Sequence, residues 1–231
     1  MMLVMIVLCL LECSSSLVVT PTSSAPLSSS LERESMKSIV YIEAPRHDTR
    51  CTCIDDIAVA VGSLNNFDNS FKIERSKVEV SLPIILDGIF PSVLLNIDRL
   101  RNDATDLIMS MTALSLHSET ISCRLALING VRCPKWHEDY VKIRLLKTYH
   151  GVGTEWVDPS DLGIRAMNQL RSAMDWDLDV KDERKIKRAL VNDVLIISGR
   201  NREDSVIIPV LHRSPPVVES DRRLLLTITI S

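Results

Sequence analysis

The chain has 231 residues, and its 27 lysines and arginines are nearly balanced by 30 aspartates and glutamates, giving a formal net charge of −3. Hydrophobic residues make up 45% of the chain and charged residues 25%, the ordinary composition of a globular protein with one domain and some appendages. Basic residues do not cluster with aromatic ones, so the composition argues against a nucleic-acid-binding protein.

Residues 1–35 differ in composition from the rest and are predicted to form a targeting or disordered leader. An apolar run from Leu3 to Leu11 precedes a stretch from Ser14 to Ser30 that is rich in serine, threonine and proline. The run is too short for a stable membrane span, which needs about 20 residues. We therefore expect a signal or organelle-transit segment and a targeted compartment. The alternative is a true start at Met36 and a cytoplasmic protein.

Residues 36–120 are predicted to form a mostly helical scaffold that is continuous with the domain after it. A short strand is expected at 38–43. In the segments 55–62 and 94–114, apolar residues recur mostly at spacings of three and four, which is typical of a helix with one buried face. These helices are expected to pack against the β-rich part of the fold.

From residue 121 onward the hydrophobic pattern changes from helical to extended, which predicts a β-rich domain over residues 121–231. Asn129-Gly130 is a strong signal for a tight turn. The segment 159–189 is expected to be helical or irregular, with residues 181–188 as a solvated face. Short strands punctuated by turns indicate an antiparallel sandwich or barrel within an α+β fold. The strands are expected at 122–128, 141–149, 194–198, 206–211 and 223–230.

Three residues in this domain have the chemistry of a metal site. His137 and Asp139 stand just before the strand 141–149, and strand alternation sends both to one side while Glu138 points away. His212 follows the strand 206–211 and is the third predicted ligand. Two imidazoles and one carboxylate form the facial triad that binds Fe(II) and leaves three coordination positions open.

The order of these residues resembles that of the iron- and 2-oxoglutarate-dependent oxygenases. The resemblance implies a double-stranded β-helix (jelly-roll or cupin-like) core, with the N-terminal helices packed against it, and Fe(II) and 2-oxoglutarate as cofactors. It also implies a basic residue on the last strand that pairs with the remote carboxylate of the cosubstrate.

The candidates for this basic residue are Arg222 and Arg223, which alternation places on opposite faces of the last strand. Arg223 followed by Thr227 is similar to the superfamily pattern of an arginine and a small hydroxyl residue, so we choose Arg223. The apolar residues on the face of Arg222 favour Arg222 instead. Tyr149, at the end of the strand 141–149, is a further candidate to bind a carboxylate.

Longer motifs are similar to a family catalogued as domain of unknown function 1826, over residues 38–230. They are CPKWHED at 133–139, RLLKTYHGVGTEW at 144–156, HRSPP at 212–216 and RLLL at 223–226. Members typically have an apolar residue in place of Glu138 and a longer glycine-rich stretch than Gly199–Asp204. Membership implies no established reaction, so the function has to be inferred from the site.

Three functions compete. The first is an Fe(II)- and 2-oxoglutarate-dependent oxygenase of unknown substrate, either a small molecule or a protein. The second is a zinc-binding or metal-responsive protein without catalysis, in which Cys133 joins His137, Asp139 and His212 in a closed tetrahedral site. The third is a metal-free β-sandwich interaction module. No phosphate loop, serine nucleophile elbow or CxxC pair supports a hydrolase or a nucleotide-binding protein.

Overall fold

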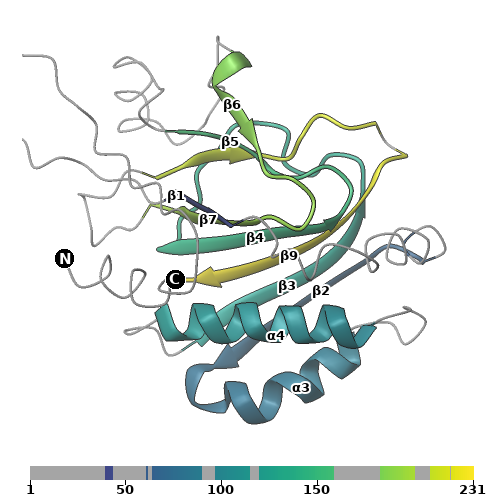
Figure 1. Cartoon of the computed structure of the whole chain (residues 1–231), viewed down its shortest axis with the longest axis vertical. Helices are drawn as coiled ribbons and strands as arrows, with labels where there is room; N and C mark the ends of the chain where they lie inside the picture. Colours follow the sequence, from purple (N-terminus) through teal and green to yellow (C-terminus); the bar gives the residue numbers. More distant parts are fainter. Residues whose placement is uncertain are drawn as a thin grey trace, which may run out of the picture.

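The computed structural model shows two antiparallel sheets with helices packed on the larger one (Figure 1). The structure describes residues 40–43, 61, 64–89, 97–114, 120–158, 183–200, 209–218 and 220–231. The predicted leader and nearly all of the predicted helix at 55–62 lie outside these ranges. Among the residues that are described, no helix combines the length and apolarity needed to cross a membrane.

The larger sheet, called the major sheet, has six strands in the order β1-β7-β4-β9-β3-β2. All neighbouring strands in it are antiparallel, and β9 is central, paired with β3 on one side and β4 on the other. The strands are β1 (Val40–Glu43), β2 (Phe67–Glu74), β3 (Thr120–Asn129), β4 (Ile143–His150), β7 (Val194–Ser198) and β9 (Arg222–Ile230).

The smaller sheet, called the minor sheet, has the order β6-β5-β8. Its strands are β5 (Glu155–Val157), β6 (Ile186–Arg188), which follows the 3-10 turn Glu183–Lys185, and β8 (Leu211–Arg213). The backbone of His137 extends this sheet beyond β8, because His137 and His212 exchange two N–H···O hydrogen bonds of 3.0 Å each. From β3 onward the chain therefore passes back and forth between the two sheets.

Two helices cover one face of the major sheet. They are α3 (Val78–Ile89), entered through the 3-10 turn Arg75–Lys77, and α4 (Ile97–Leu114). The buried residues of α4 include Leu100, Ala104, Ile108 and Met111, which lie on one side of the helix because they are three or four positions apart. They form a single core with alternate residues of the strands, such as Leu125, Leu145, Leu226 and Ile228.

The intervening residues of the same strands point to the opposite face and are largely polar. Register pairs join Ser70 to Arg124, Arg124 to Thr227, and Arg144 to Thr229 across β2, β3, β9 and β4. The major sheet therefore has an apolar face against the helices and a polar face toward the minor sheet. The candidate site lies on the polar face.

Several sequence predictions need correction. Strand β2 lies within the segment predicted to be mostly helical, although its alternation of Phe71 and Ile73 with Ser70 and Lys72 is a strand signal. Strands β5 and β6 were not predicted, because three residues are too few for a period to be recognised. The last strand before His212 was expected at 206–211, whereas β8 is Leu211–Arg213 and includes His212 itself; residues 201–208 lie outside the described ranges.

Ile108→Ala tests the contact between α4 and the major sheet. Ile108 is fully buried, so its truncation should lower the free energy of unfolding by about 2–5 kcal/mol through lost burial and a residual cavity. Asn102→Ala, an exposed change on the same helix, is the control and should stay within about 0.5 kcal/mol of the wild type. Urea denaturation measures both; equal stabilities would contradict this packing.

Candidate functional site

The side chains of His137, Asp139 and His212 lie together at one end of the minor sheet. One ligand atom from each falls within 4.8 Å of the other two. His137 and Asp139 come from the segment before β4, and His212 comes from the middle of β8. The backbone hydrogen bonds between His137 and His212 align the two imidazoles, whose ring centroids are 4.4 Å apart.

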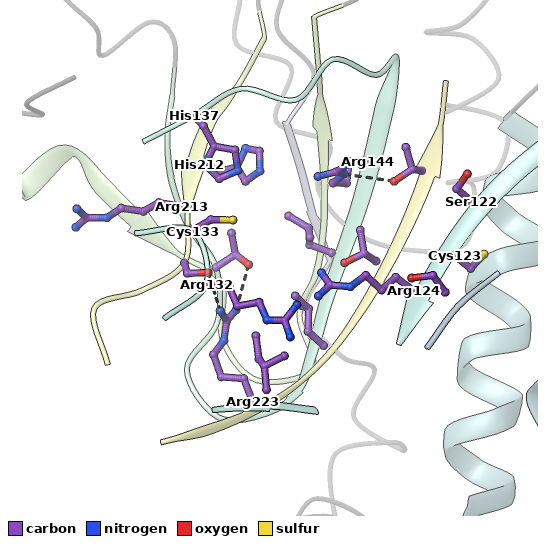
Figure 2. A pocket seen from close by; sticks show the side chains of 18 of the residues that line it. Ser122, Cys123, Arg124, Arg132, Cys133, His137, Arg144, His212, Arg213 and Arg223 are labelled. Carbon is purple, nitrogen blue, oxygen red and sulfur yellow. Dashed lines mark hydrogen bonds between the residues drawn. The ribbon is translucent and has the colours of Figure 1, made fainter. Parts of the chain in front are cut away.

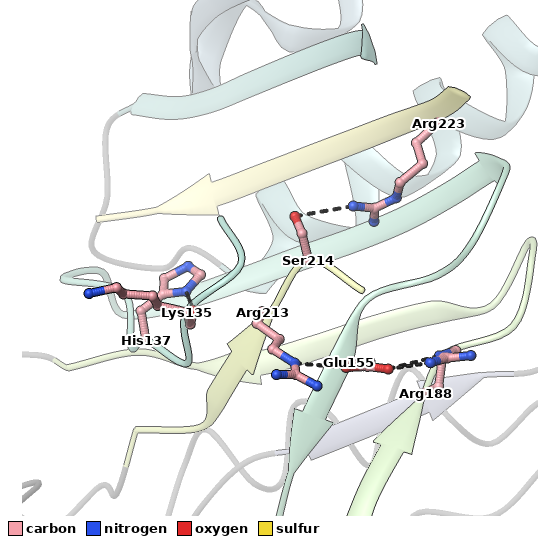
Figure 3. Close-up of polar contacts among 7 residues, drawn as sticks. All are labelled: Lys135, His137, Glu155, Arg188, Arg213, Ser214 and Arg223. Atoms are coloured by element: carbon pink, nitrogen blue, oxygen red, sulfur yellow. Dashed lines mark hydrogen bonds and ion pairs between the residues drawn. The ribbon is translucent and has the colours of Figure 1, made fainter. Parts of the chain in front are cut away.

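Both imidazoles are oriented by backbone carbonyls. Nδ1 of His137 lies 3.0 Å from the carbonyl oxygen of Lys135, and Nδ1 of His212 lies 3.3 Å from that of Val210. Figure 3 shows His137 beside Lys135. A carbonyl oxygen can only accept, so Nδ1 carries the proton in each neutral ring. Each Nε2 therefore keeps a lone pair for a ligand bond, the arrangement that holds metal-binding histidines in place. Burial is the main cause that lowers the pKa of His137, which favours its neutral form.

The two carboxylate oxygens of Asp139 have different surroundings. Oδ1 forms an ion pair of 2.6 Å with Nη1 of Arg144. Oδ2 is buried and lies 3.1 Å from Nε2 of His212, but it has no hydrogen-bond partner among the described residues. Burial opposes ionisation, but the neighbouring His212 and Arg144 outweigh it, so the pKa of Asp139 is below its ordinary value. Oδ2 is thus a buried anionic oxygen without a hydrogen-bond donor.

Glu138 points away from these three side chains, as strand alternation predicts. Its carboxylate pairs with Arg200, and Nη2 of Arg200 donates to Oε2 over 3.0 Å. The N–H of Arg200 also donates to the carbonyl of Asp139. Gly199 allows this close approach, because a Cβ there would meet that carbonyl oxygen at 2.6 Å.

A cavity of about 500 Å³, lined by His137 and His212, lies between the polar face of the major sheet and the minor sheet. Figure 2 shows that Arg124, Arg132 and Arg223 point into this cavity, with His137 and His212 on one side of it. No aspartate or glutamate is among the described residues that line it. Its basic lining residues are Lys72, Arg124, Arg132, Arg144, Arg213 and Arg223.

Arg223 is the most buried of these cations, with a relative exposure of 1%. Nη1 donates to the hydroxyl of Ser214 over 3.2 Å (Figure 3), Nη2 makes a longer contact of 3.5 Å with Thr154, and Nε has no partner. Burial lowers the pKa of the guanidinium to about 10, so it stays charged at neutral pH. No carboxylate among the described residues pairs with it, which leaves a buried cation for a bound anion.

Arg213, by contrast, is held in place by its neighbours. Its Nε donates to Oε2 of Glu155 over 2.8 Å, and its guanidinium lies 4.4 Å from the ring of Trp136. Glu155 pairs with Arg188 through its other oxygen, so one carboxylate lies between two guanidinium groups (Figure 3). This cluster fixes the minor sheet beside His212.

Two residues predicted to bind a cofactor lie elsewhere. Arg222 points to the helix side of β9, where it donates to the backbone carbonyls of Val61 and Leu64. Tyr149 is also on the helix side, in the same core as Leu145 of β4. Its hydroxyl donates to Asp103 of α4 over 2.6 Å. Neither residue lines the cavity.

The proposed fourth zinc ligand, Cys133, also needs correction. Cys133 lines the cavity and is an exposed free thiol, but it does not belong to the group of ligand atoms formed by His137, Asp139 and His212. The closed four-ligand zinc site predicted as an alternative is therefore not formed in this structure.

Sequence reasoning missed Arg144, Thr154 and Ser214 as site residues. Thr154 and Ser214 were noted only as members of the RLLKTYHGVGTEW and HRSPP motifs. The alternation of β4 identifies Arg144 once Leu145 is known to face the core. Nothing in the sequence predicts that Thr154 and Ser214 meet Arg223, because these contacts join three separate segments.

One family model and several solved structures match this chain. The model of the family described as "Protein of unknown function (DUF1826)" matches residues 90–228. No curated protein matches the chain. A full-length Neurospora crassa protein in complex with alpha-KG is 15% identical, with a TM-score of 0.40 over 83% of this chain and 73% of that one.

Two further solved structures are similar at the same level. A prolyl-4-hydroxylase of Pseudomonas putida is 13% identical, with a TM-score of 0.39 over 82% of this chain and 90% of that one. The Fe(II)/(alpha)ketoglutarate-dependent dioxygenase TqaL is 12% identical, with a TM-score of 0.40 over 77% and 73%. Similarities this low carry no argument about function, which rests on the side chains described above.

Tyr149→Phe tests the position of this tyrosine. Removal of a hydroxyl that bonds Asp103 should lower the free energy of unfolding by about 1 kcal/mol. Denaturant unfolding of both proteins measures the difference. A variant as stable as the wild type would contradict the contact between Tyr149 and α4.

Proposed function

Because the chain belongs to the family of unknown function DUF1826, its activity has to be inferred from its site, and we propose that it is an Fe(II)- and 2-oxoglutarate-dependent oxygenase. One observation carries the proposal: the two imidazoles of a His-Asp-His group line the same cavity as a buried arginine that has no acidic partner among the described residues. The first suits a divalent cation and the second suits a carboxylate.

The side chains fit a metal ion. Nε2 of His137, Nε2 of His212 and Oδ2 of Asp139 are the proposed ligand atoms. The buried Oδ2 has no hydrogen-bond donor, and a cation in front of it would satisfy this oxygen. Arg144 would hold the other oxygen, Oδ1, and so fix the carboxylate for a single bond to the metal. Two nitrogens and one oxygen are a ligand set that suits Fe(II) and leaves room for other ligands.

Arg223 is proposed to bind the remote carboxylate of 2-oxoglutarate. A guanidinium presents two parallel N–H groups that match the two oxygens of a carboxylate. The hydroxyls of Ser214 and Thr154 already lie at this guanidinium and would add hydrogen bonds to the same anion. Burial excludes competing water and strengthens the pairing.

Bound Fe(II) and 2-oxoglutarate supply an oxidation by dioxygen, which takes two electrons from 2-oxoglutarate and two from a substrate C–H bond. The products are CO₂, succinate and the hydroxylated substrate, and one oxygen atom of dioxygen ends in succinate and the other in the hydroxylated substrate. The protein contributes position, charge and exclusion of water. All the residues assigned to these roles lie within 121–231, the segment interpreted as the metal-site domain.

The path of the chain supports a double-stranded β-helix, the fold implied by the resemblance to these oxygenases. Such a jelly roll has eight antiparallel strands in two facing sheets. Four segments of the proposed core are β3, β9, β4 and β7 in the major sheet, and four are His137, β8, β5 and β6 in the minor sheet. Strands β1 and β2 then extend the edges of the major sheet.

Metal binding is the first test. The wild type should bind one Mn(II) per chain in a calorimetric titration, and His212→Ala and Asp139→Ala should each weaken binding by at least about 100-fold. Cys133→Ser is the control and should bind as the wild type does. Equal loss in Cys133→Ser would restore the zinc alternative, and an absence of binding to the wild type would retire the metal site.

Turnover is the second test. Protein reconstituted with Fe(II) without oxygen should release succinate from 2-oxoglutarate when oxygen is admitted. Arg223→Gln should raise the KM for 2-oxoglutarate by about 30-fold, because a carboxylate loses its charged partner. Arg222→Gln, on the other face of β9, should leave this KM unchanged. No succinate and no binding of 2-oxoglutarate by the wild type would sink the oxygenase proposal.

A further inference from the structure

The cavity holds more positive charge than the proposed metal and cosubstrate require. Arg144 is paired with Asp139, Arg213 with Glu155, and Arg223 is assigned to 2-oxoglutarate. Three cations remain on the side formed by β2 and β3, and we call them the basic cluster: Lys72, Arg124 and Arg132. They need a separate explanation.

One carboxylate, that of Asp68, forms ion pairs with two of these cations. Asp68 accepts from Nε and Nη2 of Arg124 over 2.6 and 2.8 Å, and from Nη1 of Arg132 over 2.6 Å. The hydrogen bond from Arg124, assisted by the charges of both arginines, lowers the pKa of Asp68 to about 2, so Asp68 is ionised at neutral pH. Lys72 has no acidic partner among the described residues. Three positive charges therefore face one negative charge.

The geometry leaves these cations able to bind a ligand. Each guanidinium has five N–H groups, of which Asp68 takes two from Arg124 and one from Arg132. Lys72 lies on the same sheet face as Arg124, because β2 and β3 pair Ser70 with Arg124 and Lys72 with Ser122. The hydroxyls of Ser70 and Ser122 thus lie between the charges, and both line the cavity.

The basic cluster also differs from Arg223 in exposure. The side chains of Arg124 and Arg132 are 34% and 50% exposed, whereas Arg223 is almost fully buried. The cluster therefore lies toward the solvent side of a cavity whose volume of about 500 Å³ is typical of a small-molecule site. A ligand that enters from solvent would meet it before the buried part of the cavity.

We propose that the basic cluster binds an anionic group, a carboxylate or a phosphate, of a small-molecule substrate. The hydroxyls and guanidinium groups on this side supply donors, and no carboxylate opposes an anion among the described residues that line the cavity. That the bound anion belongs to a substrate rests on the proposed function, whereas anion binding itself can be measured whether or not the protein is an oxygenase. If Asp68 served only to stabilise the fold, its ion pairs would account for the presence of Arg124 and Arg132 at the cavity but not for that of Lys72.

Calorimetric titration with inorganic phosphate, and separately with malonate, tests this at low salt, both without 2-oxoglutarate and with 2-oxoglutarate at saturation. At least one anion should bind the wild type saturably, and the stronger of the two identifies the group. Lys72→Gln combined with Arg132→Gln should weaken binding by about tenfold, since two charged contacts are lost. Lys77→Gln, an exposed lysine outside the cavity, removes the same kind of charge and should change nothing.

The inference is overturned if neither anion binds the wild type, if the double variant binds as well as the wild type, or if 2-oxoglutarate displaces the anion. Lys72→Gln alone guards against a folding defect, because this exposed side chain has no structural partner among the described residues. Anion binding without any 2-oxoglutarate binding would defeat the oxygenase proposal and leave the anion site. Turnover without anion binding would support the oxygenase proposal and defeat the anion site.

Discussion

Strands β3, β4 and β9 are each paired on both sides in the major sheet, and this pairing dictates where every side chain on them points. Residues such as Leu125, Leu145 and Leu226 are buried against the helices. A slip of one residue would expose this apolar set and bury its polar neighbours, so burial holds the register. The register in turn directs Arg223 and Arg144 into the cavity.

This arrangement lowers the stability of the fold at the cavity. A buried guanidinium without an acidic partner destabilises a fold, and among the described residues Arg223 donates only to the hydroxyl groups of Ser214 and Thr154. Several other buried charges among the described residues are paired, such as Glu138 with Arg200 and Glu155 with Arg213. Departures from this rule tend to occur where a ligand completes the electrostatics. Arg223 and the donorless oxygen of Asp139 are two such departures beside one cavity.

The errors in the sequence interpretation have a common origin. Tyr149 was chosen for its place at the end of the strand 141–149, but its direction depends on which face of β4 meets α4. Cys133 was predicted to complete a tetrahedral zinc site, but its thiol does not belong to the ligand group in the structure. Strand β2 was hidden because helical signals on both sides of it outweighed its own short alternation. In each case the prediction used a local sequence pattern, although the outcome depends on tertiary contacts.

Patterns within a single segment were enough to predict the change from helical to β-rich structure near residue 121 and the opposite directions of Glu138 and Asp139. They also separated Arg222 from Arg223, because a strand has a period of two whatever surrounds it. Strand alternation alone could not say which of the two arginines enters the cavity, or that Lys72, Arg124 and Arg132 gather on one side of it. Those facts follow from the pairing of strands far apart in the chain, and only the burial of one sheet face against α3 and α4 selects them.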